Sequence, residues 1–160
     1  MLPKPSLLES DRVRRTVVDF IRLLRGLAFK RDKHEPQLII EAEEADVVEA
    51  FGRAGYVHPW LLSFKYRGED RNLARFFYDE DRSEYPYRQD HIRLYADEYP
   101  SGEVALAGHT EASSVTHREA HLEREGEIGP AIRRIRGLLE DAGLEYRVVT
   151  DDPARTGAPE

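Results

Sequence analysis

Four of the six histidines lie between His91 and His121, and they are the residues of this chain best suited to chemistry. The first part of this segment alternates apolar and polar residues, as a β-hairpin does around a turn at 99–102 (YPSG). Pairing the apolar even positions of the two strands places His91 opposite His109. Side chains opposed in this way have Cβ atoms roughly 5 Å apart, so two imidazoles can share a proton or a ligand.

One chemistry that suits this face is metal-free acid–base catalysis. His91 and His109 would exchange a proton in such a site. Arg93 would hold a phosphate or another oxyanion, and Tyr95 would stack a nucleic-acid base. If the protein is an enzyme, these four residues are the predicted catalytic set of a small histidine-dependent hydrolase, such as a toxin-type ribonuclease.

The second chemistry is metal binding, and it uses the residues that follow the hairpin. Glu111 continues the same face, and the next helix carries His117 and His121 four residues apart, on one side. A helix amino terminus disfavours a charged imidazole, and a metal ligand must be neutral. The spacing H-x-E-x-H differs from the H-E-x-x-H of zinc proteases, so a solvated or structural role stays open. The predicted ligands of zinc or another divalent ion are His109, His117, His121 and Glu111, with His91 as a further candidate.

The elements that must position these residues follow from the hydrophobic periodicity. Helices are predicted over residues 13–27, 44–54 and 130–142, with a short one that starts at a capping box over 116–119. Strands are predicted at 37–41, 60–66, 73–79, 91–96, 103–109 and 146–150. The charged, proline-containing segment 79–90, between the predicted strands 73–79 and 91–96, is predicted to be a loop.

This order predicts an α+β fold. It consists of an antiparallel sheet of two hairpins plus flanking strands, packed on one face by an N-terminal and a C-terminal amphipathic helix. The hairpins would pair 60–66 with 73–79 and 91–96 with 103–109, and the face that carries the histidines would be partly free. The length of 160 residues suits a single domain over 1–150, followed by a tail at 151–160.

Composition limits the classes of function. The chain has no cysteine, which excludes disulfides, thiolate metal sites and cysteine nucleophiles. No apolar run reaches the ~20 residues of a membrane span, and the start does not resemble a secretory signal, so a cytoplasmic protein is expected. The net charge of −7 disfavours generic nucleic-acid binding. Lysine is rare among the 24 basic residues, which is typical of a high-GC genome and suits a halophilic source.

The preferred interpretation is a non-enzymatic interaction or assembly protein that needs no cofactor. Long charged loops and polar ends suit a small structural or connector subunit of a larger complex or virus particle. Its partners would be protein subunits in a homo- or hetero-oligomer, in the cytoplasm or in a virion assembled there. The alternatives are the histidine-dependent hydrolase and a metal-stabilised binding module. Convergence of His91, His109 and His117 in a cleft would favour these alternatives over assembly.

Overall fold

The computed structural model describes residues 17, 20, 35–58, 66–123 and 126–150. The chain divides into two compact units, one formed by Met1–Lys33 with Pro59–Arg67 and the other by His34–His58 with Gly68–Glu160. In the first unit, Val17 and Phe20 are helical and exposed. The other predictions for that unit, and the predicted tail, lie outside the described residues: the rest of the helix at 13–27, the strand residues 60–65 and the segment 151–160.

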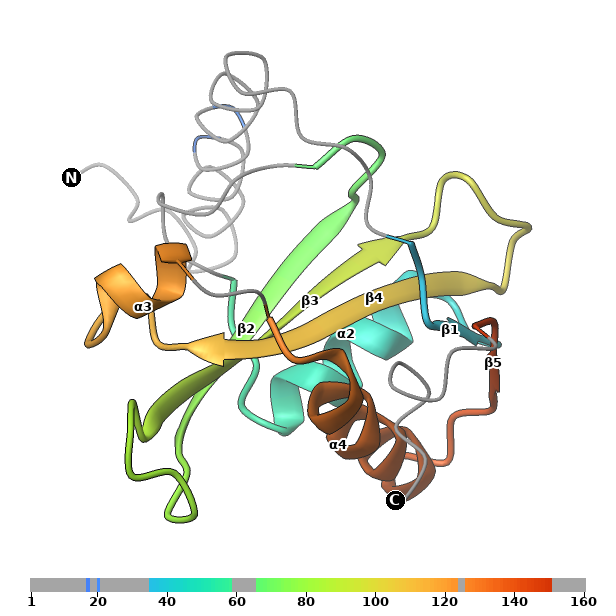
Figure 1. Ribbon diagram of the computed structural model, residues 1–160. Helices are drawn as coiled ribbons and strands as arrows, with labels where there is room; N and C mark the ends of the chain where they lie inside the picture. The colour runs from blue at the N-terminus through green and yellow to red at the C-terminus, as the bar shows by residue number, and fades with distance from the viewer. Residues whose placement is uncertain (1–16, 18–19, 21–34, 59–65, 124–125, 151–160) are drawn as a thin grey trace, which may run out of the picture. The chain divides into compact units, whose positions relative to one another are not determined.

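The second unit is built on a five-stranded antiparallel sheet with the strand order β2-β3-β4-β1-β5 (Figure 1). Strands β2, β3 and β4 follow one another as a meander, and β1 lies between β4 and β5. The predicted α+β class with an antiparallel sheet is confirmed. The strands are β1 (Leu38–Ile40), β2 (Arg71–Tyr78), β3 (Tyr87–Tyr95), β4 (Val104–Ala112) and β5 (Tyr146–Val148).

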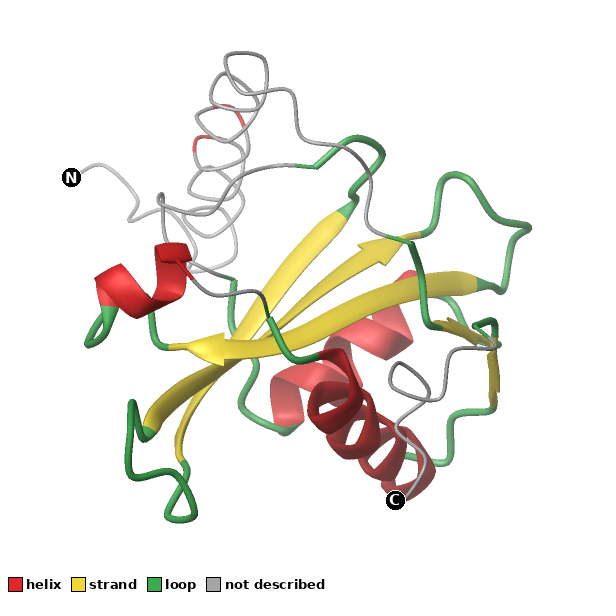
Figure 2. Cartoon of the chain, viewed as in Figure 1, coloured by secondary structure: helices red, strands yellow, loops and turns green. Residues whose placement is uncertain are grey.

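The helices of this unit are α2 (Glu44–Arg53), α3 (Arg118–Glu123) and α4 (Ile128–Asp141). Helices α2 and α4 cover one face of the sheet, and α3 follows the end of β4 (Figure 2). Gly55 and Gly143 adopt positive φ just beyond α2 and α4, where a glycine can end a helix without strain. Among the residues that the structure describes, no helix combines the length and the hydrophobicity that a membrane crossing requires.

The main core lies between the sheet and these two helices. The even positions of β3 and β4 point into it, as the alternation predicts, and so does the buried face of each helix. Full burial of one such side chain contributes about 1.5–3 kcal/mol, so this layer is the main source of stability. Its fully buried members include Phe51, Ile92, Leu94, Leu106, Ile132, Ile135 and Leu139.

The sheet differs from the prediction in the length of its strands, and it has a pairing of β2 with β3 that the sequence did not predict. Strand β2 pairs with β3 over its whole length, from Arg71 opposite Leu94 to Tyr78 opposite Tyr87. Strand β3 therefore begins at Tyr87 rather than at residue 91, and β4 runs on to Ala112. The predicted loop at 79–90 is shorter for the same reason, because its last four residues belong to β3.

A buried carboxylate explains why the polar residues before position 91 can belong to a strand. Asp90 is fully buried on the face that α4 covers. Arg134 of α4 donates its Nε–H to Asp90 Oδ2 at 2.9 Å and an Nη2–H to Oδ1 at 2.5 Å. Thr110 and Tyr56 donate their hydroxyls to the same carboxylate at 2.5 and 3.3 Å. Burial and the charge of Asp90 raise the pKa of Tyr56, which stays protonated as a donor.

Substitution of Asp90 tests this link between β3 and α4. We expect Asp90→Ala to lower the free energy of unfolding by about 2–4 kcal/mol, because Arg134, Thr110 and Tyr56 all lose their acceptor. The exposed Asp141→Ala at the end of α4 is the control and should stay within about 0.5 kcal/mol of wild type. Chemical denaturation at neutral pH measures both, and equal stabilities of the two variants would contradict the assigned role of Asp90.

Candidate functional site

The histidine face is formed by β3 and β4, in the register that the alternation predicts. His91 lies directly opposite His109, and their ring centroids are 5.5 Å apart with an angle of 63° between the planes. A slip by one residue would turn Ile92 and its neighbours out of the core, so the apolar positions determine which histidines meet. Gly126 lies against the His109 ring without room for a Cβ, which helps to hold the imidazole in place.

Glu111 lies at the centre of this cluster. Its carboxylate oxygens are 3.4 Å from His91 Nδ1, from His109 Nε2 and from His121 Nδ1. Gln89 donates its Nε2–H to Glu111 Oε1 at 2.7 Å. Burial raises the pKa of Glu111, but the neighbouring His109 and His91 outweigh it and hold the pKa well below its ordinary value. The cluster therefore surrounds a carboxylate anion.

His91 is kept neutral by its surroundings. Its side chain is 8% exposed, and burial lowers the pKa of His91 to about 3, with the positive charge of Arg93 as the next cause. A neutral imidazole carries one N–H. His91 nevertheless faces an oxygen on each side, with Asn72 Oδ1 2.5 Å from Nε2 and Glu111 Oε1 3.4 Å from Nδ1. Two acceptors therefore compete for one ring proton.

Arg93 and Tyr95 share this face, but the structure buries both of them. Arg93 Nε lies 3.1 Å from Glu69 Oε2, and the two side chains are 4% and 1% exposed. Tyr95 is fully buried and packs against Ile39 and Ala105. The prediction of a partly free face is thus wrong at this end, where Tyr95 lies directly opposite Ala105 and both it and Arg93 are buried. Arg93 is engaged by a carboxylate instead of being presented to an oxyanion.

His117 does not join the cluster. Its ring packs against Tyr85 and Tyr87, at centroid distances of 5.2 and 6.1 Å. His117 immediately precedes α3, and its carbonyl accepts the N–H of His121 at 3.0 Å, but its ring is turned to the two tyrosines instead of to Glu111. Of the predicted metal ligands, the structure brings together His109, His121 and Glu111, adds His91, and leaves His117 apart.

Three side chains of the cluster have donor atoms close enough to share one cation. In the part of the chain that the structure describes, the donor atoms of His91, His109 and Glu111 form the group that lies within 4.8 Å of one another. His121 is near Glu111 but has a second contact, because its Nδ1 also lies 3.2 Å from the carbonyl oxygen of Ala112. The cluster thus has a core of three residues and His121 beside it.

Sequence reasoning misses two residues of the cluster, Gln89 and Asn72. Gln89 lies two positions before His91, so the alternation of a strand places both on the same face. The prediction missed it because 79–90 was assigned to a loop. Asn72 reaches the cluster from β2, where it is paired with Arg93. No local pattern specifies that pairing, because it depends on how β2 and β3 are aligned.

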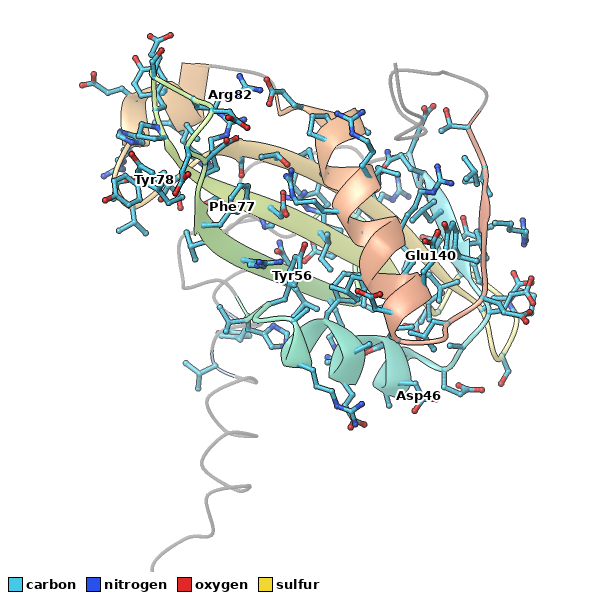
Figure 3. The ribbon with its side chains drawn as sticks, turned by 90° about the horizontal axis from the view of Figure 1, so that it is seen from below. Asp46, Tyr56, Phe77, Tyr78, Arg82 and Glu140 are labelled. Atoms are coloured by element: carbon cyan, nitrogen blue, oxygen red, sulfur yellow. The ribbon has the colours of Figure 1, made fainter. Side chains whose placement is uncertain are left out.

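A second feature is an apolar groove near the loop that joins β2 and β3. Tyr78 and Tyr87 oppose each other there, with their rings edge to face at 5.1 Å. Val115 is 74% exposed and the two tyrosines more than half exposed. Figure 3 shows Phe77 and Tyr78 at this end of the strands, close to Arg82. The groove has a volume of about 360 Å³ and is lined by Phe76, Phe77, Tyr78, Tyr87, Arg88, Ser113, Val115 and Thr116.

Comparison with known proteins identifies no relative of this chain. No protein-family model, no curated protein and no solved structure matches it. Function is therefore inferred from the geometry of the histidine cluster and of the groove.

The low pKa of His91 predicts how stability depends on pH. The pKa is about 3 in the folded protein and has the ordinary value of 6.5 in the unfolded chain. Below pH 6.5 the unfolded chain binds a proton that the folded protein excludes, so the free energy of unfolding falls as the pH drops from 6.5 toward 3. Between pH 6.5 and pH 5, we expect wild type to lose about 1–2 kcal/mol more than His91→Gln.

Urea denaturation in the presence of a chelator, at several pH values, measures this difference. His58→Gln, which changes a histidine outside the cluster, is the matched control and should keep the steep pH dependence of wild type. The same pH dependence in His91→Gln as in wild type would show that His91 is not the group responsible.

Proposed function

We propose that this protein is a non-enzymatic interaction module that binds a protein partner through the apolar groove. The observation that carries the proposal is the exposure of large apolar side chains on both sides of the groove. Tyr78, Tyr87 and Val115 leave more than half of their surface in water, and an exposed apolar patch with polar surroundings is typical of an interface. The module fits a connector or structural subunit of a larger complex or virus particle, in the cytoplasm or in a virion assembled there.

The charges around the groove favour a basic partner. Glu80, Asp81 and Glu119 are exposed on the neighbouring loop and on α3. Arg82 and the buried Arg88 both bind Glu127, at 2.7 and 2.9 Å, and Arg82 also lies 3.9 Å from Asp79, so two carboxylates compensate the two positive charges. We infer a partner segment that places an aromatic or aliphatic side chain in the groove and flanks it with Lys or Arg. A second copy of this acidic chain would bring like charges together.

The burial of the histidine face favours an interaction protein over a hydrolase. A hydrolase must bring its acid–base groups and its cation into contact with a substrate. The side chains of His91 and His109 are 8% and 13% exposed, and Arg93 is already paired with Glu69. These residues are thus used to build the protein interior.

Selection from a phage-displayed random peptide library tests the groove. We expect enrichment of peptides in which an aromatic or aliphatic residue lies between basic residues. A synthetic peptide of this type should bind Val115→Ser about 5- to 10-fold more weakly than wild type, because the substitution removes most of the apolar area of that side chain. Fluorescence anisotropy with the labelled peptide measures both affinities.

The matched control is Val149→Ser, an equal substitution at an exposed valine outside the groove, which should bind the peptide as wild type does. Failure to enrich any peptide, or equal binding by both serine variants, would contradict the proposal. Native mass spectrometry adds one more outcome: a homo-oligomer that Val115→Ser dissociates would replace the basic partner by a second copy of the chain.

A further inference from the structure

We propose that His91, His109 and Glu111 bind one divalent transition-metal ion, with zinc as the best match. This site is separate from the groove, and it gives the histidine cluster a role that partner binding does not require. The three residues come from two adjacent strands, two of them directly opposed and the third two positions further along β4. A metal ion bound there would join β3 to β4 on the face opposite the main core.

The spacing of the donor atoms matches a metal site better than a hydrogen-bonded cluster. Zinc ligands lie about 2.0–2.2 Å from the ion, so two ligand atoms at a tetrahedral angle are about 3.3–3.5 Å apart. His91 Nδ1 lies 3.4 Å from Glu111 Oε1 and His109 Nε2 lies 3.4 Å from Oε2, and one donor atom from each of the three residues lies within 4.8 Å of the others. Hydrogen bonds between nitrogen donors and a carboxylate are shorter, at about 2.7–2.9 Å. The cluster is therefore open enough to admit an ion between its donor atoms.

The competition for the ring proton of His91 points to the same conclusion. Asn72 is fully buried, and its Oδ1 accepts the Nε2–H of His91 at 2.5 Å. With the proton on Nε2, the lone pair of Nδ1 points toward the carboxylate of Glu111, and a cation between them removes that repulsion. A carbonyl oxygen that holds the far N–H of a ligating histidine is the usual second-shell arrangement of metal sites.

The charge balance of the cluster also suits a cation. Glu111 is a buried anion whose side chain is 11% exposed, and Gln89 gives it one neutral hydrogen bond. Arg93, the positive charge that acts on His91, is compensated by Glu69 at 3.1 Å. A divalent ion therefore meets one carboxylate and two imidazoles, in an interior that screens charges weakly.

The ligand set selects the class of metal. Two imidazole nitrogens and one carboxylate suit zinc and ferrous iron, whereas magnesium and calcium prefer sites made of oxygen alone. His121 is assigned as a positioning residue, because its Nδ1–H is directed at the Ala112 carbonyl and the edge of the Glu111 carboxylate. It orients Glu111 from α3, and its loss should weaken binding without abolishing it.

The test is metal uptake by the full-length protein after treatment with a chelator. We expect native mass spectrometry to show one zinc ion per chain, and competition with a chromophoric chelator to give its affinity. His91→Ala, His109→Ala and Glu111→Gln should each lower the affinity at least 100-fold, whereas His121→Ala should lower it about 10-fold. Ferrous iron under anaerobic conditions is the second ion tested, and millimolar magnesium or calcium should not displace zinc.

The matched control is His117→Ala, which removes a nearby histidine outside the group and should bind zinc as wild type does. Glu111→Gln is nearly isosteric and decides the matter if an alanine variant fails to fold. Histidine ¹⁵N spectra of wild type need no variant, and zinc should shift His91 Nδ1 and His109 Nε2. Absence of uptake, or uptake that Glu111→Gln leaves unchanged, would overturn the site. Peptide binding to the groove is measured separately, so either proposal can fail while the other stands.

Discussion

Strand β3 is buried on both faces although it carries a run of polar side chains, and the surrounding elements provide their partners. A buried polar or charged group destabilises a protein unless it is hydrogen-bonded or paired. On the face that α4 covers, Arg134 pairs with Asp90 and Glu127 pairs with Arg88. On the other face, Glu69 pairs with Arg93 and Glu111 accepts a hydrogen bond from Gln89. Helix α4 and the ends of β2 and β4 are thus tied to β3 by charge as well as by apolar contact.

The same constraint acts differently on the charged residues of β3 and on His91. Asp90 and Arg93 each meet an opposite charge. His91 meets two oxygens, from Asn72 and Glu111, and as a neutral ring it has one proton for them. A bound metal ion would resolve that mismatch, which places the proposed metal site in the interior of the sheet and the proposed interface on its surface.

The two proposals meet in one short segment. Glu111, near the end of β4, is the proposed ligand, and Ser113, Val115 and Thr116 line the groove immediately after it. His121 then returns from α3 to the same carboxylate. A metal ion at the cluster would hold Glu111 directly, and His121 contacts that carboxylate from the other end of the segment that forms one wall of the groove. The protein would then combine a buried metal site with an exposed binding surface, as the predicted metal-stabilised binding module does.

The sequence by itself determined the α+β class, most element positions and the pairing of His91 with His109, because these follow from local periodicity: apolar residues must face one core. It also placed Glu111 on the histidine face. Only the tertiary structure decided the alignment of β2 with β3, and with it the approach of Asn72 and the burial of the polar end of β3. Those features depend on partners distant in the chain, such as Arg134, and no local pattern records which charges will meet once the chain has folded.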